Sequence, residues 1–269
     1  MATISTSDGT TIWYESSGAT SSSPESQPAV LLVHGITENN QSLAPVAERL
    51  RANHQVTVMD LRGHGSSSTA ERYDLEAMAG DVIAVMGAAG LVRPHIVGHS
   101  LGGAVVSAVG AAAPVSSVVN IDQPLVLGAF KEALAPAEPL LRDPATFGPT
   151  IDAMFGDMYG PKLSAEEQQR LQALRRADQT VVLGVWELIF SMSAEDINAT
   201  VEGALAGYQN QPVPYLSLLG TDLGPDYSAW LTAHIPGAQN ELWPDHGHYP
   251  HLVDPDRMVA RLESFWADA

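Results

Sequence analysis

A serine flanked by glycines is the strongest chemical signal in the chain. Ser100 lies in the segment Gly98-His99-Ser100-Leu101-Gly102, after an apolar run and before a helical run of small residues. A serine at such a strand-to-helix turn needs small neighbours, because its backbone is strained and the chain passes close to itself. The start of the following helix also favours developing negative charge. The pattern therefore predicts a nucleophilic serine.

A serine hydroxyl is a weak nucleophile at its free pKa, so it needs an adjacent base and hydrogen-bond donors for an oxyanion. Nine histidines compete for the role of base. His248 follows the last predicted strand on a loop, and this position favours it over its neighbours His246 and His251. We expect His99 to pack beside the nucleophile.

The elements around Ser100 alternate between short apolar runs and helical patterns. Nearly unbroken apolar strands separated by helices indicate a mostly parallel sheet with helices on both faces. A hairpin over residues 2–16, turning at Asp8-Gly9, is expected before it, and residues 18–28 are expected to form a surface loop. The predicted strands are 29–33, 55–59, 95–98, 115–121, 214–219 and 240–243, and the predicted helices are 43–51, 74–89, 101–113, 227–234 and 255–266.

The strand pattern disappears between residue 123 and about residue 210, where three or four helical segments follow. Two of them have recognisable N-caps, Ser164 with Glu167 and Ser193 with Asp196. We therefore predict an α/β core formed by residues 1–122 and 211–269, interrupted by a helical cap over residues 123–210. Most aromatic residues and methionines of this insertion should form its own core, and some should line a substrate pocket. They are Phe130, Phe147, Met154, Phe155, Met158, Tyr159, Trp186, Phe190 and Met192.

Composition narrows the classes of partner. The 269 residues carry a formal net charge of −18, which opposes binding to nucleic acid or to anionic membranes. There is no cysteine, and no segment approaches the roughly 20 apolar residues that cross a bilayer. We expect a cytoplasmic protein without a cofactor or metal ion, because neither a phosphate-binding loop nor a set of metal ligands is apparent.

These landmarks together make the sequence resemble the α/β-hydrolase fold superfamily, in particular its serine esterases and lipases with a helical cap. The resemblance runs through residues 33–36, through 60–66, through the serine turn and through 247–255, in the family order. It spans most of the chain outside the cap. It implies a Ser-acid-His triad in that chain order, with an oxyanion hole made by two backbone amides.

Carried over residue by residue, the resemblance supports His248 as the base. The oxyanion donors would be the amides of Leu101, the residue after the nucleophile, and Ile36, the residue after His34-Gly35. Arg62 and His64 would brace the structure rather than react.

The acid has two candidates. In the family it usually follows the seventh strand, and Asp222, two residues after Gly220, is nearest to that place. Some relatives carry it after the sixth strand, where Asp122 lies. We prefer Asp222 to Asp122, and Asp226 and Asp245 are weaker choices.

The expected activity is hydrolysis of a small ester or related acyl bond, with an acyl-enzyme intermediate and a small-molecule acyl substrate. Serine at position 100, rather than aspartate, argues against the carboxylate-nucleophile chemistry of haloalkane dehalogenases and epoxide hydrolases. A cofactor-free perhydrolase or haloperoxidase-like activity, and a non-catalytic small-molecule receptor, stay open as alternatives. The oligomeric state is also open.

Overall fold

The computed structural model describes residues 1–19 and 28–268, and a single eight-stranded sheet forms its centre. The strand order is β1-β2-β4-β3-β5-β6-β7-β8. Strands β3 to β8 pair in parallel, whereas β2 is antiparallel to both β1 and β4. The strands are β1 (Ala2–Ser5), β2 (Thr11–Gly18), β3 (Val30–Val33), β4 (Gln55–Met59), β5 (His95–His99), β6 (Ser117–Ile121), β7 (Tyr215–Leu219) and β8 (Gln239–Leu242). The predicted mostly parallel sheet is confirmed.

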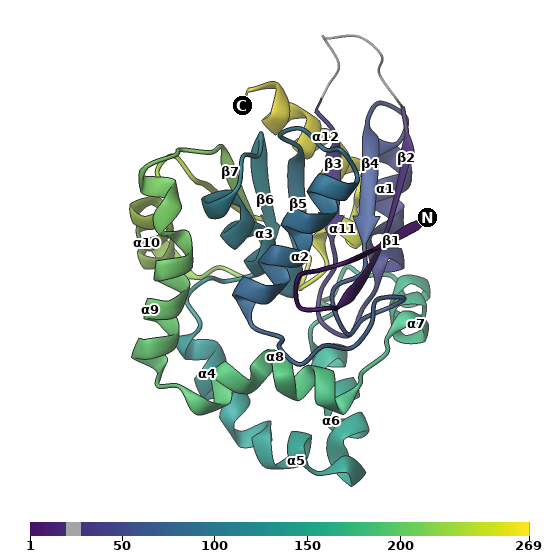
Figure 1. Ribbon diagram of the computed structural model, residues 1–269. Helices are drawn as coiled ribbons and strands as arrows, with labels where there is room; N and C mark the ends of the chain where they lie inside the picture. The colour runs from purple at the N-terminus through teal and green to yellow at the C-terminus, as the bar shows by residue number, and fades with distance from the viewer. Residues whose placement is uncertain (20–27, 269) are drawn as a thin grey trace.

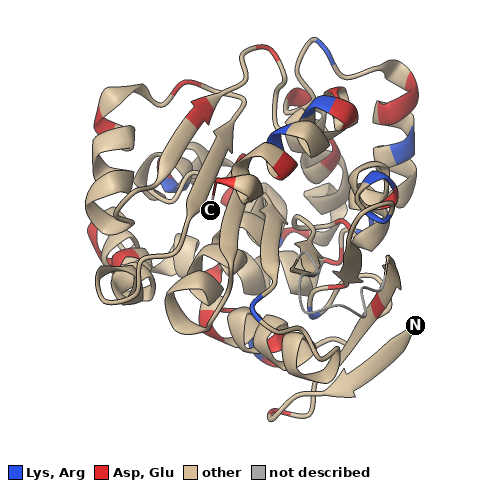
Figure 2. Ribbon diagram, turned by 90° about the horizontal axis from the view of Figure 1, so that it is seen from above, with Lys and Arg blue, Asp and Glu red and all other residues tan. Residues whose placement is uncertain are grey.

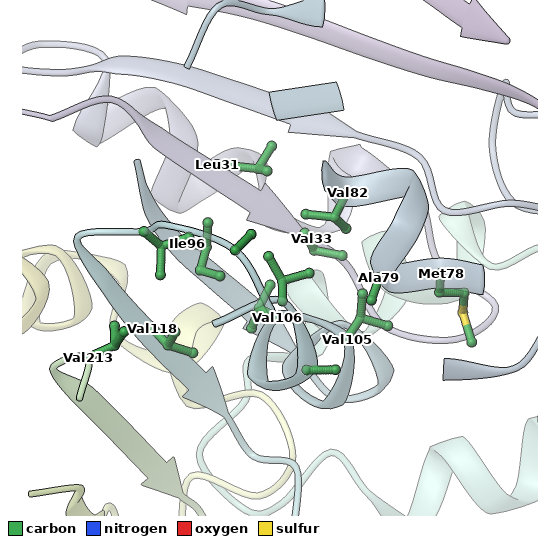
Figure 3. Packing of buried hydrophobic residues seen from close by; sticks show 14 of the residues in the cluster. Leu31, Val33, Met78, Ala79, Val82, Ile96, Val105, Val106, Val118 and Val213 are labelled. Atoms are coloured by element: carbon green, nitrogen blue, oxygen red, sulfur yellow. The ribbon is translucent and has the colours of Figure 1, made fainter. Parts of the chain in front are cut away.

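Helices cover both faces of this sheet (Figure 1). Because successive side chains of a strand point to opposite faces, Leu31 and Val33 pack toward α2 and α3, as Figure 3 shows, while Val30 and Leu32 pack toward α1 and α12. The helices of the core are α1 (Ala44–Leu50), α2 (Leu75–Ala88), α3 (Leu101–Ala112), α10 (Gly224–His234), α11 (Pro250–Val253) and α12 (Pro255–Ala267), with the 3-10 turn η1 (Asn40–Leu43) after β3.

The N-terminal hairpin is present, but its turn is longer than the two residues expected from Asp8-Gly9. Residues 6–10 connect the strands, with the Thr6 carbonyl accepting from the Gly9 amide at 3.0 Å. Gly9 has a φ of 85°, so it occupies the left-handed position that follows a turn in a longer hairpin loop. Of the predicted surface loop, residues 20–27 lie outside the described residues.

The insertion between β6 and β7 contains six α-helices rather than three or four. Pro136, Pro139 and Pro144 each lie at the first or second position of a new helical segment, where the amide proton that proline lacks would have no partner within the helix. Ser164 and Ser193 cap their helices as predicted. Figure 1 shows most of these helices gathered beyond one end of the sheet. They are α4 (Gly128–Leu134), α5 (Glu138–Arg142), α6 (Pro144–Asp157), α7 (Ala165–Leu174), α8 (Gln179–Ser191) and α9 (Ala194–Leu205), with the 3-10 turns η2 (Ala135–Ala137) and η3 (Ala206–Gln209).

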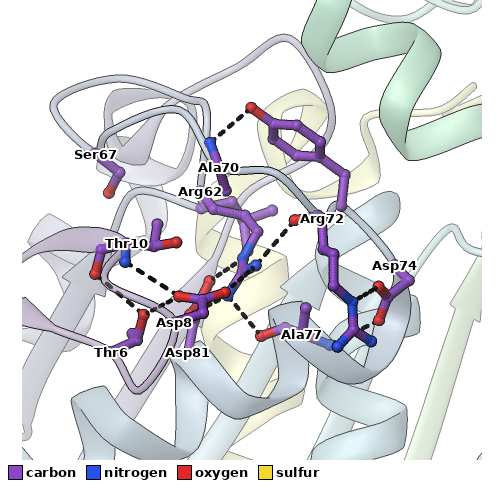
Figure 4. Close-up of polar contacts among 12 residues, drawn as sticks. Thr6, Asp8, Thr10, Arg62, Ser67, Ala70, Arg72, Asp74, Ala77 and Asp81 are labelled. Atoms are coloured by element: carbon purple, nitrogen blue, oxygen red, sulfur yellow. Dashed lines mark hydrogen bonds and ion pairs between the residues drawn. The ribbon is translucent and has the colours of Figure 1, made fainter.

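Arg62 joins the N-terminal hairpin to α2 (Figure 4). It is 2% exposed and makes two 2.7 Å hydrogen bonds to the Asp81 carboxylate and one of 3.0 Å to Asp8. It also donates to the carbonyls of Arg72 and Ala77. Arg62 thus braces the structure, as predicted.

Acidic residues are spread over many helices and loops, and Lys and Arg are fewer (Figure 2). Within residues 1–19 and 28–268, no helix combines the length and hydropathy needed to cross a bilayer.

The burial of His95 predicts that the folded protein is less stable at mildly acidic pH than at neutral pH. Its Nδ1 lies 2.8 Å from Ser117 Oγ and its ring stacks on Trp266 with centroids 4.6 Å apart. Burial lowers the pKa of His95 to about 4, whereas the unfolded chain takes up this proton near pH 6.5. Between these values the unfolded state binds more protons, so the free energy of unfolding falls as pH falls.

From pH 7 to pH 5, His95 alone should lower the free energy of unfolding by about 2 kcal/mol. Urea titrations of the wild type and of His95→Gln at both values measure this contribution. The variant should lose about 2 kcal/mol less than the wild type over this interval. An equal loss in both proteins would show that His95 is not held neutral in the folded state.

Candidate active site

Ser100 occupies a sharp turn between β5 and α3, with φ 52° and ψ −126°. The turn brings backbone segments into contact. A Cβ atom at Gly98 would lie 2.1 Å from the Gly102 carbonyl oxygen, and one at Gly102 would lie 2.3 Å from the Val33 carbonyl oxygen. Larger residues at positions 98 and 102 would push α3 away from β3 and β5, which explains the glycines on both sides of the serine.

Ser100 opens onto a cavity of about 500 Å³. His248, Asp122, Ile36 and Leu101 line the same cavity. These residues come from loops that follow β8, β6, β3 and β5, and the carboxyl ends of parallel strands meet at one edge of the sheet. The structure therefore brings together all of the predicted site residues except Asp222.

Asp122 pairs with His248. The distance between His248 Nδ1 and Asp122 Oδ2 is 2.6 Å, and Asp122 Oδ1 accepts from the Gly220 amide at 2.6 Å. Burial raises the pKa of Asp122, but the hydrogen bonds from His248 and Gly220 outweigh this effect, so the pKa lies below its ordinary value. An ionised Asp122 places the proton of His248 on Nδ1, which leaves Nε2 free to accept one.

The preference for Asp222 over Asp122 is not supported by this geometry. Asp222 is exposed, and its carboxylate accepts from the Gly224 amide at 2.8 Å. Helix α10 begins at Gly224, and no hydrogen bond or ion pair joins Asp222 to His248 among the described residues. Asp226 lies in the first turn of α10, and Asp245 lies 3.7 Å from Lys162.

Both peptide groups of His248 are held by segments distant in sequence. Its amide donates to the Met158 carbonyl of the insertion at 2.9 Å, and its carbonyl lies 2.8 Å from His99 Nε2. On its other side, His99 Nδ1 lies 3.5 Å from the carboxylate of buried Glu38. Burial raises the pKa of the Glu38 carboxyl, but its interactions with His99 and Ser42 lower it by more. The pKa therefore lies below its ordinary value, and the carboxyl stays ionised. No sequence pattern pointed to Glu38, and Met158 was predicted to pack in the insertion or line the pocket, not to hold His248 through its carbonyl.

The loop after β3 presents the amide of Ile36. Among the hydrogen bonds of the described residues, none is donated by the amide of Ile36 or of Leu101. The loop is fixed from two sides, because the His34 ring bonds to the Gly35 carbonyl and accepts from the Leu61 amide. The Arg176 amide of the insertion also donates to the Thr37 carbonyl at 2.9 Å. Both residues line the cavity that contains Ser100, and neither amide has a hydrogen-bond partner among the described residues.

The neighbouring histidines have other partners. His64 and His246 bond through Nδ1 to backbone carbonyls two residues away. His251 is fully buried, and burial keeps its pKa well below the ordinary value. Over residues 1–19 and 28–268, His, Asp and Glu form no group of three or more that could hold a metal ion.

The insertion supplies much of the cavity wall. Of the aromatic residues and methionines singled out in the sequence, those lining the cavity are Phe130, Phe155, Met158 and Trp186. The others lie elsewhere: Phe147, Met154, Phe190 and Met192 pack in the core of the insertion and Tyr159 packs near Tyr249.

Comparison with known proteins agrees with this arrangement. The sequence profile described as the alpha/beta hydrolase family matches residues 30–261. The chain belongs to this family. Among solved structures, an esterase from Exiguobacterium antarcticum superposes with a TM-score of 0.79 at 20% identity, covering 98% of each chain. At this identity the likeness concerns the fold.

Curated relatives match over different lengths. A fluoroacetate dehalogenase of Burkholderia sp. is 40% identical over 84 residues, covering 29% of this chain and 28% of that protein. The chain spans only about a third of the length of this and the other first curated relatives. RutD of Shigella flexneri, described as a carbamate hydrolase, is 26% identical over 268 residues, covering 87% of this chain and 90% of RutD.

The contact between Asp122 and His248 predicts which aspartate supports reactivity. Asp122→Asn should slow covalent labelling of the protein by a small fluorophosphonate roughly a thousand-fold, because an amide at this position favours the wrong tautomer of the histidine. Asp222→Asn, the matched control, should label at the wild-type rate. Intact mass recorded over time measures both rates, and slow labelling of Asp222→Asn alone would reverse the assignment.

Proposed function

We propose that the protein is a serine hydrolase that cleaves a small carboxylic ester, or a related acyl bond, through an acyl-enzyme intermediate. The observation that carries the proposal is the 2.6 Å contact of Asp122 with His248 at the wall of the cavity onto which Ser100 opens. A carboxylate, an imidazole and a serine on a strained turn are the three groups that acyl transfer needs.

In the first half of the reaction, Ser100 Oγ attacks the substrate carbonyl carbon while His248 Nε2 takes the hydroxyl proton. The amides of Ile36 and Leu101 donate to the oxygen that becomes negative, and the start of α3 adds its dipole. The intermediate then expels the alcohol, which leaves with the proton from His248. Asp122 stabilises the imidazolium that forms between these two steps.

In the second half, water attacks the ester formed on Ser100, and His248 again takes the proton. The bond between the carbonyl carbon and Ser100 Oγ then breaks, His248 returns the proton to Oγ, and the carboxylic acid leaves. No step requires a metal ion or a cofactor, because the oxyanion donors are backbone amides.

The esterases among the similar solved structures, and RutD, which is described as a carbamate hydrolase, support acyl transfer as the reaction class. The apolar wall of the cavity supports a neutral organic substrate. Perhydrolysis, the alternative chemistry, would need peroxide in place of water as the second nucleophile.

Turnover of p-nitrophenyl esters tests the proposal. The wild type should release p-nitrophenol, and its intact mass should increase by one acyl group during the reaction. Ser100→Ala should reduce kcat/KM by at least about a thousand-fold, since only binding and the oxyanion donors are left. Asp222→Asn, an exposed change whose carboxylate contacts only its own loop, serves as a folded control that keeps the nucleophile.

Three outcomes distinguish the rivals. Loss of turnover in Ser100→Ala supports the proposal of a serine hydrolase. Tight binding of esters without release of p-nitrophenol, and without an adduct, would replace the enzyme with a receptor. Peracid formation from peroxide and acetate at rates above ester hydrolysis would replace it with a perhydrolase.

A further inference from the structure

The cavity beside Ser100 continues along one face of α3. Leu101, Ala104 and Ala108 all line it, and their spacing of three and four residues places them on the same side of the helix. With a rise of about 1.5 Å per residue, Ala108 lies about 10 Å along the helix from Leu101. The cavity is therefore deeper than a carbonyl group and its immediate substituents require.

Small side chains leave this room. The short side chains of Ala104 and Ala108 leave space beside α3. Met78 of α2 and Ala204 of α9 line the cavity on other sides. We call this part of the cavity, bordered by α2, α3 and α9, the slot. A straight chain suits such a slot, because each added methylene removes apolar surface from water.

The deep part of the slot offers little to a polar group. The hydroxyl of Ser107 donates to the Gly103 carbonyl at 2.6 Å and bonds to the Tyr215 hydroxyl at 2.7 Å, so its proton and one of its two lone pairs are already used. The remaining neighbours there include Met78, Ala108 and Leu205, which are apolar.

The charges of the cavity have one sign. Its lining includes Asp74, Asp122 and Asp157, and no Lys or Arg among the described residues. Burying a carboxylate without a cationic partner is costly. A substrate with an anionic end is therefore disfavoured both by the apolar slot and by these aspartates.

We propose that the slot along α3 binds an uncharged, unbranched hydrocarbon chain of about eight carbons attached to the reacting ester. The length follows from the depth, since an extended chain advances about 1.2 Å per bond, as an extended polypeptide does. This inference rests on the proposed function and names its substrate class: neutral medium-chain esters. The chain belongs either to the acyl part or to the alcohol part of the ester.

Two ester series measure the length and distinguish the two sources. The acyl series is p-nitrophenyl acetate, butanoate, hexanoate, octanoate and dodecanoate, and the alcohol series is the acetates of the matching n-alcohols. In one series, kcat/KM should rise about three- to four-fold per methylene up to about eight carbons and then stop rising. A profile that is flat, or highest for the shortest ester, in both series would overturn the proposal.

Ala108→Met tests the place of the chain by filling the deep end of the slot. It should lower kcat/KM for the preferred eight-carbon ester at least ten-fold and change that for the two-carbon ester by less than two-fold. Ala112→Met, on the exposed end of the same helix, is the matched control and should leave both unchanged. Ala204→Met narrows the slot from α9, at a half-buried position. If Ala108→Met fails to fold, Ala204→Met takes its place and should have the effect on the two esters that is expected of Ala108→Met.

The charge requirement has its own comparison. The mono-p-nitrophenyl ester of octanedioic acid places a carboxylate at the far end of an eight-carbon acyl chain, and its kcat/KM should be at least about a hundred-fold below that of the octanoate. If the preference for length lies in the alcohol series, the anionic ester is 8-acetoxyoctanoate and the neutral ester is octyl acetate. Equal rates for the anionic and neutral esters would contradict the proposal.

Failure of this inference is distinct from failure of the proposed function. Hydrolysis of esters that requires Ser100 but shows no preference for length or charge would contradict the proposed binding of a hydrocarbon chain along α3. It would not contradict the proposed serine hydrolase activity. No turnover of any ester, together with no fluorophosphonate adduct, would overturn both.

Discussion

Ser100 adopts a backbone conformation that few residues other than glycine adopt, and tight contacts among β3, β5 and α3 hold it there. Thr37 and Asp122 also have positive φ, and both follow strands of the same edge. Conformations of this kind cost on the order of 1–3 kcal/mol each and persist only where the surroundings determine them. The buried parallel sheet supplies those surroundings, so the geometry of the site depends on the packing of the core.

The loops at this edge support one another. Asp122 links the end of β6 to the Gly220 amide after β7 and to the ring of His248. The peptide groups of His248 are held by His99 and by Met158, the latter from the helical insertion. The insertion thus lines the cavity and also holds the backbone of His248, so the position of this histidine depends on the packing of the insertion.

Much of the fold could be predicted from the sequence because buried parallel strands are short apolar runs: Gln55–Met59 was predicted with the observed bounds. Ser100 could be predicted because glycine is required on both sides of it. The choice of Asp122 over Asp222 could not be predicted, since both aspartates follow strand ends and only the contact with His248 in the folded structure distinguishes them. The support of His248 by Met158 and Glu38 depends on distant contacts that leave no local pattern.

A crystal structure of the fluorophosphonate adduct tests the central arrangement most directly. The account predicts phosphorus bonded to Ser100 Oγ, with the phosphonyl oxygen about 2.7–3.1 Å from the amides of both Ile36 and Leu101. It also predicts that His248 still contacts Asp122. An adduct on another residue, or a phosphonyl oxygen directed away from both amides, would contradict the account.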